Sequence, residues 1–97
     1  RNPMKAIWHD EVIAESDATV VVENNHYFPA DSIRHELLQP SDKKTHCPWK
    51  GDASYSHIRV GDEINEDAVW CYADPKQAAQ EIKGCYAFWR GVEVREG

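Results

Sequence analysis

The sequence predicts a mainly β domain, largely antiparallel, with two short α-helices. Short runs of β-favouring residues recur along most of the chain, turn-forming residues separate these runs, and only two segments carry the start and stop signals of a helix. With 97 residues and 41% hydrophobic content, the chain has the size of one domain. A single core in a chain this short only just offsets the entropy of ordering it.

The first part of the chain predicts a β-meander. Strand-like runs cover residues 5–9, 12–15 and 19–23, and the polar residues between them suit tight turns. Asp31 can then cap a short helix whose apolar residues share one face until Pro40 ends it.

The middle of the chain predicts a long loop and two strands. Residues 39–52 carry no helix or strand pattern, and a loop of this length in a compact domain is more often functional than decorative. Strands are expected over residues 53–60 and 68–73. The second of these is apolar on both faces, which predicts a central position in its sheet.

The last part of the chain predicts the second helix and a final strand. Asp74 is a suitable N-cap, Pro75 suits the first turn and Gly84 suits the stop, so a helix is expected between them. Residues 85–89 return to the sheet, and the polar residues 95–97 are expected to fray.

Charge and composition limit the partners that the chain can have. Seventeen acidic and eleven basic residues give a net charge of -6, the wrong sign for binding nucleic acid. No apolar stretch approaches the roughly 20 residues that span a bilayer, so no membrane partner and a cytoplasmic location are expected. Residues 1–3 precede Met4 and are expected to be a non-native remnant, which leaves residues 4–97 as the domain. The oligomeric state stays open.

The cysteines and histidines predict neither a disulfide framework nor a metal site. Cys47, Cys71 and Cys85 form no C-x-x-C pair, and reduced thiols are the default for such a set. Only Cys47 has polar and basic neighbours. The run His35-Glu36-Leu37-Leu38-Gln39 has a glutamine where the H-E-x-x-H zinc motif has its second histidine.

The run Thr45-His46-Cys47-Pro48-Trp49-Lys50-Gly51 marks the candidate site. It places a thiol, an imidazole, an ammonium and a large ring within seven positions, and its proline and glycine restrict the backbone that carries them. A cation beside a ring suits a flat or phosphorylated ligand. The plain alternatives are a solvated lysine and a ring that fills the core.

Cys47 is a candidate nucleophile within this run. A reactive thiol needs a base, and His57 on the next strand is better placed than the adjacent His46, because neighbouring side chains on an extended backbone point in different directions. The alternative is that Cys47 packs beneath the loop as a small apolar residue.

Several blocks of residues carry a family resemblance: Val12-Ile13-Ala14-Glu15-Ser16, Glu23 with Tyr27-Phe28-Pro29, Cys47-Pro48-Trp49-Lys50-Gly51 with Ala53 and Tyr55, Trp70 and Tyr72 before Pro75, and Ala87-Phe88. Together they resemble, over nearly the whole chain, the bacterial family catalogued as domain of unknown function 427. The resemblance implies a β-tent-like fold of two antiparallel sheets meeting at an angle. Related folds bind zinc between paired C-x-x-C knuckles, which this chain lacks.

The family carries the catalogue label nucleotidyltransferase. Enzymes of that kind hold magnesium with closely placed carboxylates, and the chain has no D-x-D pair. Glu23 resembles the family's acidic position before Y-F-P and could join Lys50 and Asp52 around a nucleotide if the fold brings them together. The alternatives for Glu23 are an exposed strand end and a partner for a nearby lysine.

Three functions remain, in order of preference. The first is a domain that binds an anionic or aromatic small molecule in a pocket built from Tyr27, Trp49, Lys50 and Tyr55. The second is an enzyme of the nucleotidyltransferase type or one that uses Cys47, with Glu23 and His57 as further catalytic candidates. The third is a non-enzymatic module whose aromatic residues bind a protein partner. The sequence leaves any cofactor unknown.

Overall fold

The computed structural model describes residues 2–97, and it is mainly β and antiparallel, as the sequence predicted. The strands of the described residues are β1 (Met4–Trp8), β2 (Glu11–Ser16), β3 (Val20–Val22), β4 (Asn25–Tyr27), β5 (Leu38–Cys47), β6 (Gly51–Val60), β7 (Glu63–Cys71), β8 (Tyr86–Phe88) and β9 (Glu93–Glu96). They form a three-stranded sheet in the order β2-β1-β9, a four-stranded sheet in the order β5-β6-β7-β8, and the hairpin β3-β4.

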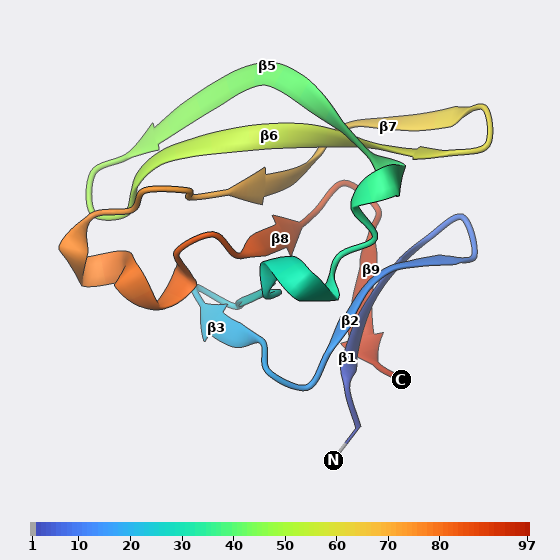
Figure 1. Ribbon diagram of the computed structural model, residues 1–97, viewed down its shortest axis with the longest axis horizontal. Coiled ribbons are helices and arrows are strands. Elements are labelled where there is room, and N and C mark those ends of the chain that lie inside the picture. The colour runs from blue at the N-terminus through green and yellow to red at the C-terminus, as the bar shows by residue number, and fades with distance from the viewer. Residues whose placement is uncertain (1) are drawn as a thin grey trace.

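The two larger sheets meet at a steep angle. In Figure 1, β5, β6 and β7 run across the top of the view, whereas β1, β2 and β9 run downward on its right-hand side. The hairpin β3-β4 lies below the four-stranded sheet and is linked to it by the bridge between Phe28 and Tyr86. This is the arrangement of two antiparallel sheets that the family resemblance implied, with one hairpin added.

The four-stranded sheet packs side chains on both of its faces. Residues that pair across an antiparallel ladder point to the same side. Ser56 pairs with Val69, and Val69 pairs with Phe88, so these residues lie on one face, here called the core face, which contributes to the larger apolar core. By the same register, Tyr55 and Trp70 lie on the opposite face, here called the aromatic face. A second apolar cluster packs there around Tyr27, Tyr72, Ala79, Ile82 and Ala87.

The predicted loop over residues 39–52 is wrong, because most of it is β5. This strand lies at the edge of its sheet and is paired only with β6. Its register shifts between Pro40 and Lys44, so the proline sits at an irregularity of the ladder. Edge strands tolerate proline and lysine, which protect an open edge from pairing with another chain. A polar edge strand therefore has a composition similar to that of a loop, which is why the sequence predicted a loop here.

The two predicted α-helices are also wrong. The first segment is split into two 3₁₀-helices, η1 (Ala30–Ser32) and η2 (His35–Leu37), because Ile33 between them is extended and bridges Ala14. The second segment is η3 (Gln77–Ile82), whose backbone is non-helical at Ala79. In the first segment, the bridge to a neighbouring strand overrides a weak local helix preference. In the second, the segment is too short for an α-helix to be stable by itself.

The C-terminal residues do not fray as predicted. Glu93–Glu96 form β9, which pairs with β1 along Met4 to Ile7, and the backbone N–H of Gly97 donates to Pro3 at 3.0 Å. Residues 2–97 contain no helix that is long and apolar enough to cross a membrane.

Candidate functional site

Glu23, in the turn of the hairpin β3-β4, has a strained backbone conformation. Glu23 and Asn24, the two residues between the strands, have φ angles of 53° and 66°. A two-residue hairpin turn favours positive φ at both positions, which asparagine tolerates and glutamate disfavours. Glu23 is nevertheless found at this position, where its side chain reaches Lys50 and Trp49. Strained residues of this kind concentrate at functional sites.

Lys50 is the buried cation of the site. It lies in the turn between β5 and β6, and only 7% of the residue is exposed. Its Nζ donates a hydrogen bond to Glu23 Oε1 and lies 5.2 Å from the ring centroid of Tyr72, while Trp49 Nε1 donates to Glu23 Oε2 at 3.3 Å. The carboxylate thus binds two donors from adjacent residues, and it neutralises the lysine.

The turn that carries Lys50 is held by the segment after β7. Lys76 N–H donates to the carbonyl of Lys50 at 2.9 Å, and Lys76 Nζ donates to the carbonyl of Pro48 at 2.7 Å. Gly51 has a φ of 108°, which other residues resist, and so permits the tight exit into β6. The sequence predicted this role for the glycine.

The pKa values of Lys50 and Glu23 are both shifted in the direction that keeps the two groups charged. Burial lowers the pKa of Lys50, but the hydrogen bond with Glu23 and Coulombic interactions with neighbouring groups raise it more, so the net pKa lies above 10.5. The hydrogen bonds from Lys50 and Trp49 lower the pKa of Glu23 below 4.5. Both groups are therefore charged at neutral pH.

A pocket of about 180 Å³ opens beside Lys50 on the aromatic face, here called the aromatic pocket. It is lined by Lys50, Tyr55, Trp70, Tyr72 and Trp89. The rings of Trp70 and Trp89 stand nearly perpendicular, at 79°, with centroids 5.9 Å apart. Trp70 Nε1 donates to the hydroxyl of Tyr27 at 3.1 Å. Tyr27 is fully buried, so it fixes Trp70 from behind and does not line the pocket.

Two cations lie over the outer rings of this pocket. Lys43 Nζ is 5.4 Å from the ring centroid of Tyr55, and the guanidinium carbon of Arg90 is 4.6 Å from that of Trp89. Within residues 2–97 neither side chain forms an ion pair with an acidic residue. Lys43 and Arg90 are not among the residues that line the pocket, and we call them the rim cations because each lies over a ring that does line it.

The structure brings some of the predicted site residues together. Glu23 binds both Trp49 and Lys50, and Lys50 and Tyr55 line the aromatic pocket. Trp49, predicted as a pocket residue, does not line it. Asp52 does not join this group, because its carboxylate pairs with His46 Nδ1 at 2.7 Å on the exposed side of the turn.

The site predicted from the sequence did not include five residues at the pocket: the lining residues Trp70, Tyr72 and Trp89 and the rim cations Lys43 and Arg90. The spacing of Trp70 and Tyr72 was a usable signal, since residues two apart on a strand share one face. Trp89 and both cations come close to the other pocket residues only through the packing of segments that are distant in the sequence, which the local sequence does not reveal.

Cys47 and His57 lie apart. Cys47 pairs with Gly51 at one end of β6, and His57 pairs with Gln39 six positions further along that strand. At about 3.3 Å per residue the separation is about 20 Å. His57 Nδ1 instead accepts the backbone N–H of Asp67 at 2.9 Å, and Asp67 accepts the hydroxyl of Ser41. The thiol and the imidazole therefore do not form a nucleophile and base pair.

The structure places one of the two predicted carboxylates, Glu23, beside Lys50. Within residues 2–97 no group of three or more histidine, cysteine, aspartate or glutamate side chains is placed to hold a metal ion. The single carboxylate of the site, Glu23, is occupied by Lys50 and Trp49.

Cys71 should resist alkylation in the folded protein. The residue is 8% exposed, and burial raises the pKa of its thiol to about 11, so at pH 8 only roughly one thiol in a thousand is thiolate. We expect iodoacetamide to leave Cys71 unmodified in the native state and to modify it after unfolding in urea, as measured by peptide mass spectrometry. Equal labelling in both states would contradict the buried position.

Comparison with known proteins places the chain in a family. No curated protein matches it. Residues 1–96 match the family described as a domain of unknown function, DUF427. This match covers almost the whole chain and agrees with the residue blocks that carried the resemblance, and the chain therefore belongs to the DUF427 family.

Proposed function

We propose that the protein is a cytoplasmic binding domain that holds a small planar anion in the aromatic pocket. The observation that carries this proposal is the combination of ring-lined walls with two rim cations, Lys43 and Arg90, that have no acidic partner among the described residues.

The size and lining of the pocket support a ligand with one flat ring. A volume of about 180 Å³ is below the range of about 300–1,000 Å³ that is usual for drug-sized ligands. Trp70 and Trp89 present a face and an edge at right angles, and aromatic rings prefer offset and edge-to-face contacts of this kind. A ligand ring placed against these two side chains would be held on two sides.

The charges at the pocket favour a negative group on that ring. Lys43 and Arg90 lie over the outer rings, so a carboxylate or phosphate at the mouth of the pocket can contact them without displacing another carboxylate. Lys50 is deeper and is neutralised by Glu23, so its attraction for an anion is reduced. We therefore assign Lys50 to the wall of the pocket and the two rim cations to recognition of the anion.

Glu23→Gln should tighten the binding of a planar anion severalfold, because it removes the negative charge that neutralises Lys50. Titrations followed by tryptophan fluorescence test this with matched pairs of probes, benzoate against benzamide and adenosine monophosphate against adenosine. The anionic member of each pair should bind more tightly. Trp89→Leu should abolish the binding, since Trp89 is 41% exposed and forms one side of the pocket.

The matched control is Trp8→Leu, which removes a tryptophan from β1 in the other sheet and should leave the affinity unchanged. Equal affinities for charged and neutral probes would show that the pocket does not recognise a negative group on the ligand. Binding that survives Trp89→Leu would place the ligand elsewhere, and the absence of binding by any probe would reject this class of ligand.

A further inference from the structure

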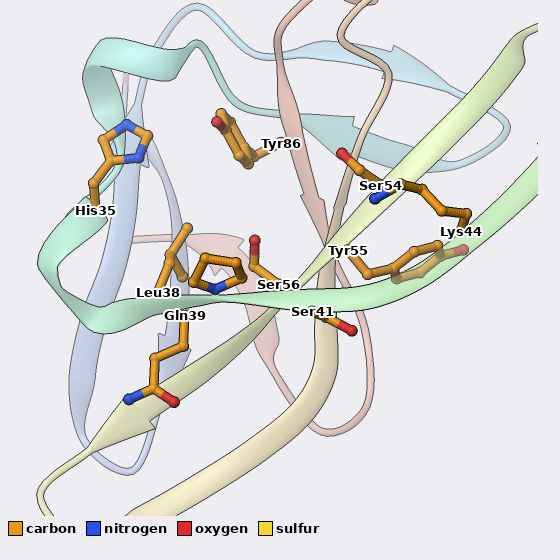
Figure 2. A pocket seen from close by; sticks show the side chains of 10 residues that line it. His35, Leu38, Gln39, Ser41, Lys44, Ser54, Tyr55, Ser56 and Tyr86 are labelled. Atoms are coloured by element: carbon orange, nitrogen blue, oxygen red, sulfur yellow. The ribbon is translucent and has the colours of Figure 1, made fainter.

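A second and larger pocket lies on the opposite face of the same sheet. It has a volume of about 340 Å³ and is lined by residues of β5 and β6, by His35 of η2 and by Tyr86 of β8 (Figure 2). In Figure 2, Ser54 and Ser56 project from β6 toward the side on which Tyr86 lies, and His35 stands at the far end. We call it the serine pocket.

Ser54 and Ser56 are polar residues in positions where a core residue is expected. Ser56 pairs with buried Val69, and Ser54 pairs with buried Cys71, which pairs in turn with Tyr86. Both serines therefore lie on the core face, and both are half-buried. Apolar side chains at such positions would extend the core, whereas hydroxyl groups there need a hydrogen-bonding partner.

These hydroxyl groups have no hydrogen-bond partner in the part of the chain that the structure describes. Among the hydrogen bonds of residues 2–97, none involves the side-chain hydroxyl of Ser54, Ser56 or Tyr86. No buried polar side-chain atom of the described residues is left unsatisfied, so the three hydroxyl oxygens are accessible to solvent, and all three residues line the pocket. They are free to bind a molecule that enters it.

Lys44 is the basic residue among those that line the serine pocket. Lys44 pairs with Ser54 across the ladder, and Figure 2 shows its side chain extending toward Ser54. Lys44 forms no ion pair with a described acidic residue, and none of the described residues that line the pocket is acidic. Burial raises the pKa of Tyr86, so its hydroxyl remains protonated and can donate.

The remaining lining is apolar and suits a short carbon skeleton. Leu38 and Pro40 line the pocket near His35, whose ring packs edge-on against Tyr86 at 5.5 Å between centroids. Three hydroxyl donors and one ammonium beside an apolar wall match a molecule that has an oxyanion at one end and carbon atoms at the other.

We propose that the serine pocket binds a small non-aromatic organic anion, with its oxyanion held by Lys44, Ser54, Ser56 and Tyr86. A carboxylate and a phosphate monoester share this chemistry. The proposal does not depend on the aromatic pocket, because the two pockets lie on opposite faces of the four-stranded sheet and share only Tyr55, whose hydroxyl is paired with Thr45 at 2.9 Å.

The test is a titration followed by the backbone amide signals in NMR spectra. The probes are glycerol 3-phosphate, lactate and, as the uncharged reference, glycerol. The expected result is that at least one of the two anions shifts the amides of Ser54, Ser56 and Tyr86, while glycerol does not. Preference for the phosphate or for the carboxylate identifies the source of the oxyanion.

Lys44→Met should weaken the binding of that anion about tenfold, because it removes the one charged donor. The matched control is Lys83→Met, which removes an exposed lysine beyond η3 and should change nothing. The double variant Ser54→Ala and Ser56→Ala should also weaken binding, and its NMR spectrum reports whether the fold is kept.

Three results would overturn the proposal. The first is that neither anion shifts the three amides. The second is that glycerol binds as tightly as the anions. The third is that Lys44→Met and Lys83→Met weaken binding equally, which would reduce the effect to general electrostatic attraction. Shifts confined to Trp70 and Trp89 count as the first result, and they would leave the aromatic pocket as the binding site.

Discussion

Lys50→Glu should lower the free energy of unfolding by about 3 kcal/mol. The substitution places a carboxylate in a side-chain position that is only 9% exposed, facing the carboxylate of Glu23 and the rings of Trp49 and Tyr72. An unpaired charge in such a position costs about 3–5 kcal/mol when it cannot relax into water. The lower value is expected because Glu23, half exposed, can turn away. Urea denaturation measures the change.

Two companion variants separate charge from packing. Lys50→Met keeps most of the volume of the buried stem and removes only the charged end, so it should cost about 1 kcal/mol. Combining Lys50→Glu with Glu23→Lys restores opposite charges and should recover part of the loss. If Lys50→Glu were no more destabilising than Lys50→Met, the ion pair would have no part in holding the turn to the hairpin.

The contribution of the ion pair should be constant over the middle of the pH range and decrease at both ends. The folded-state pKa of Glu23 lies below 4.5, so its contribution is present above pH 4.5 and is lost as the pH falls through that lowered value. The folded-state pKa of Lys50 lies above 10.5, so its contribution is present below pH 10.5 and is lost as the pH rises through the raised value. The difference in stability between wild type and Lys50→Met should follow this profile.

The local sequence was sufficient to predict the strands in which apolar and polar residues alternate or in which β-favouring residues predominate. The runs at β1, β2 and β3 were expected close to their observed bounds, and so were β6 and β8. Elements whose conformation depends on a distant partner were missed. β5 is extended because β6 lies beside it, and Ile33 is extended because it bridges Ala14.

Only the part of the site that lies within one continuous run of residues could be predicted from the sequence. The turn that contains Trp49 and Lys50 was identified from its own composition, and Glu23 was selected as an acidic position from the family resemblance. The contact between Glu23 and Lys50 depends on how a hairpin packs against a sheet. The separation of Cys47 from His57 depends on the register of β5 and β6, which is set by tertiary packing and not by the residues themselves.

Trp70→Leu should lower the free energy of unfolding by about 3 kcal/mol and abolish binding at the aromatic pocket. The ring packs nearly perpendicular to both Tyr27 and Trp89, and pairs of this kind contribute about 0.5–1.5 kcal/mol beyond burial. Its Nε1 is also the hydrogen-bond partner of the Tyr27 hydroxyl. Because Tyr27 is fully buried, losing that partner costs a further 1–3 kcal/mol, approximately.

The matched variant is Trp89→Leu, which removes the same kind of ring from a position that is 41% exposed. It loses the hydrogen bond from Nε1 to the carbonyl of Asp67, the contact with the Arg90 guanidinium and part of the ring packing, all at an exposed position, so it should cost about 1 kcal/mol while still abolishing binding. A double-mutant cycle of Trp70→Leu with Tyr27→Phe isolates the hydrogen bond and should give a coupling of about 1 kcal/mol. A coupling near zero, or equal losses for Trp70→Leu and Trp89→Leu, would mean that Tyr27 does not position Trp70 and that the rear wall of the pocket is held by packing alone.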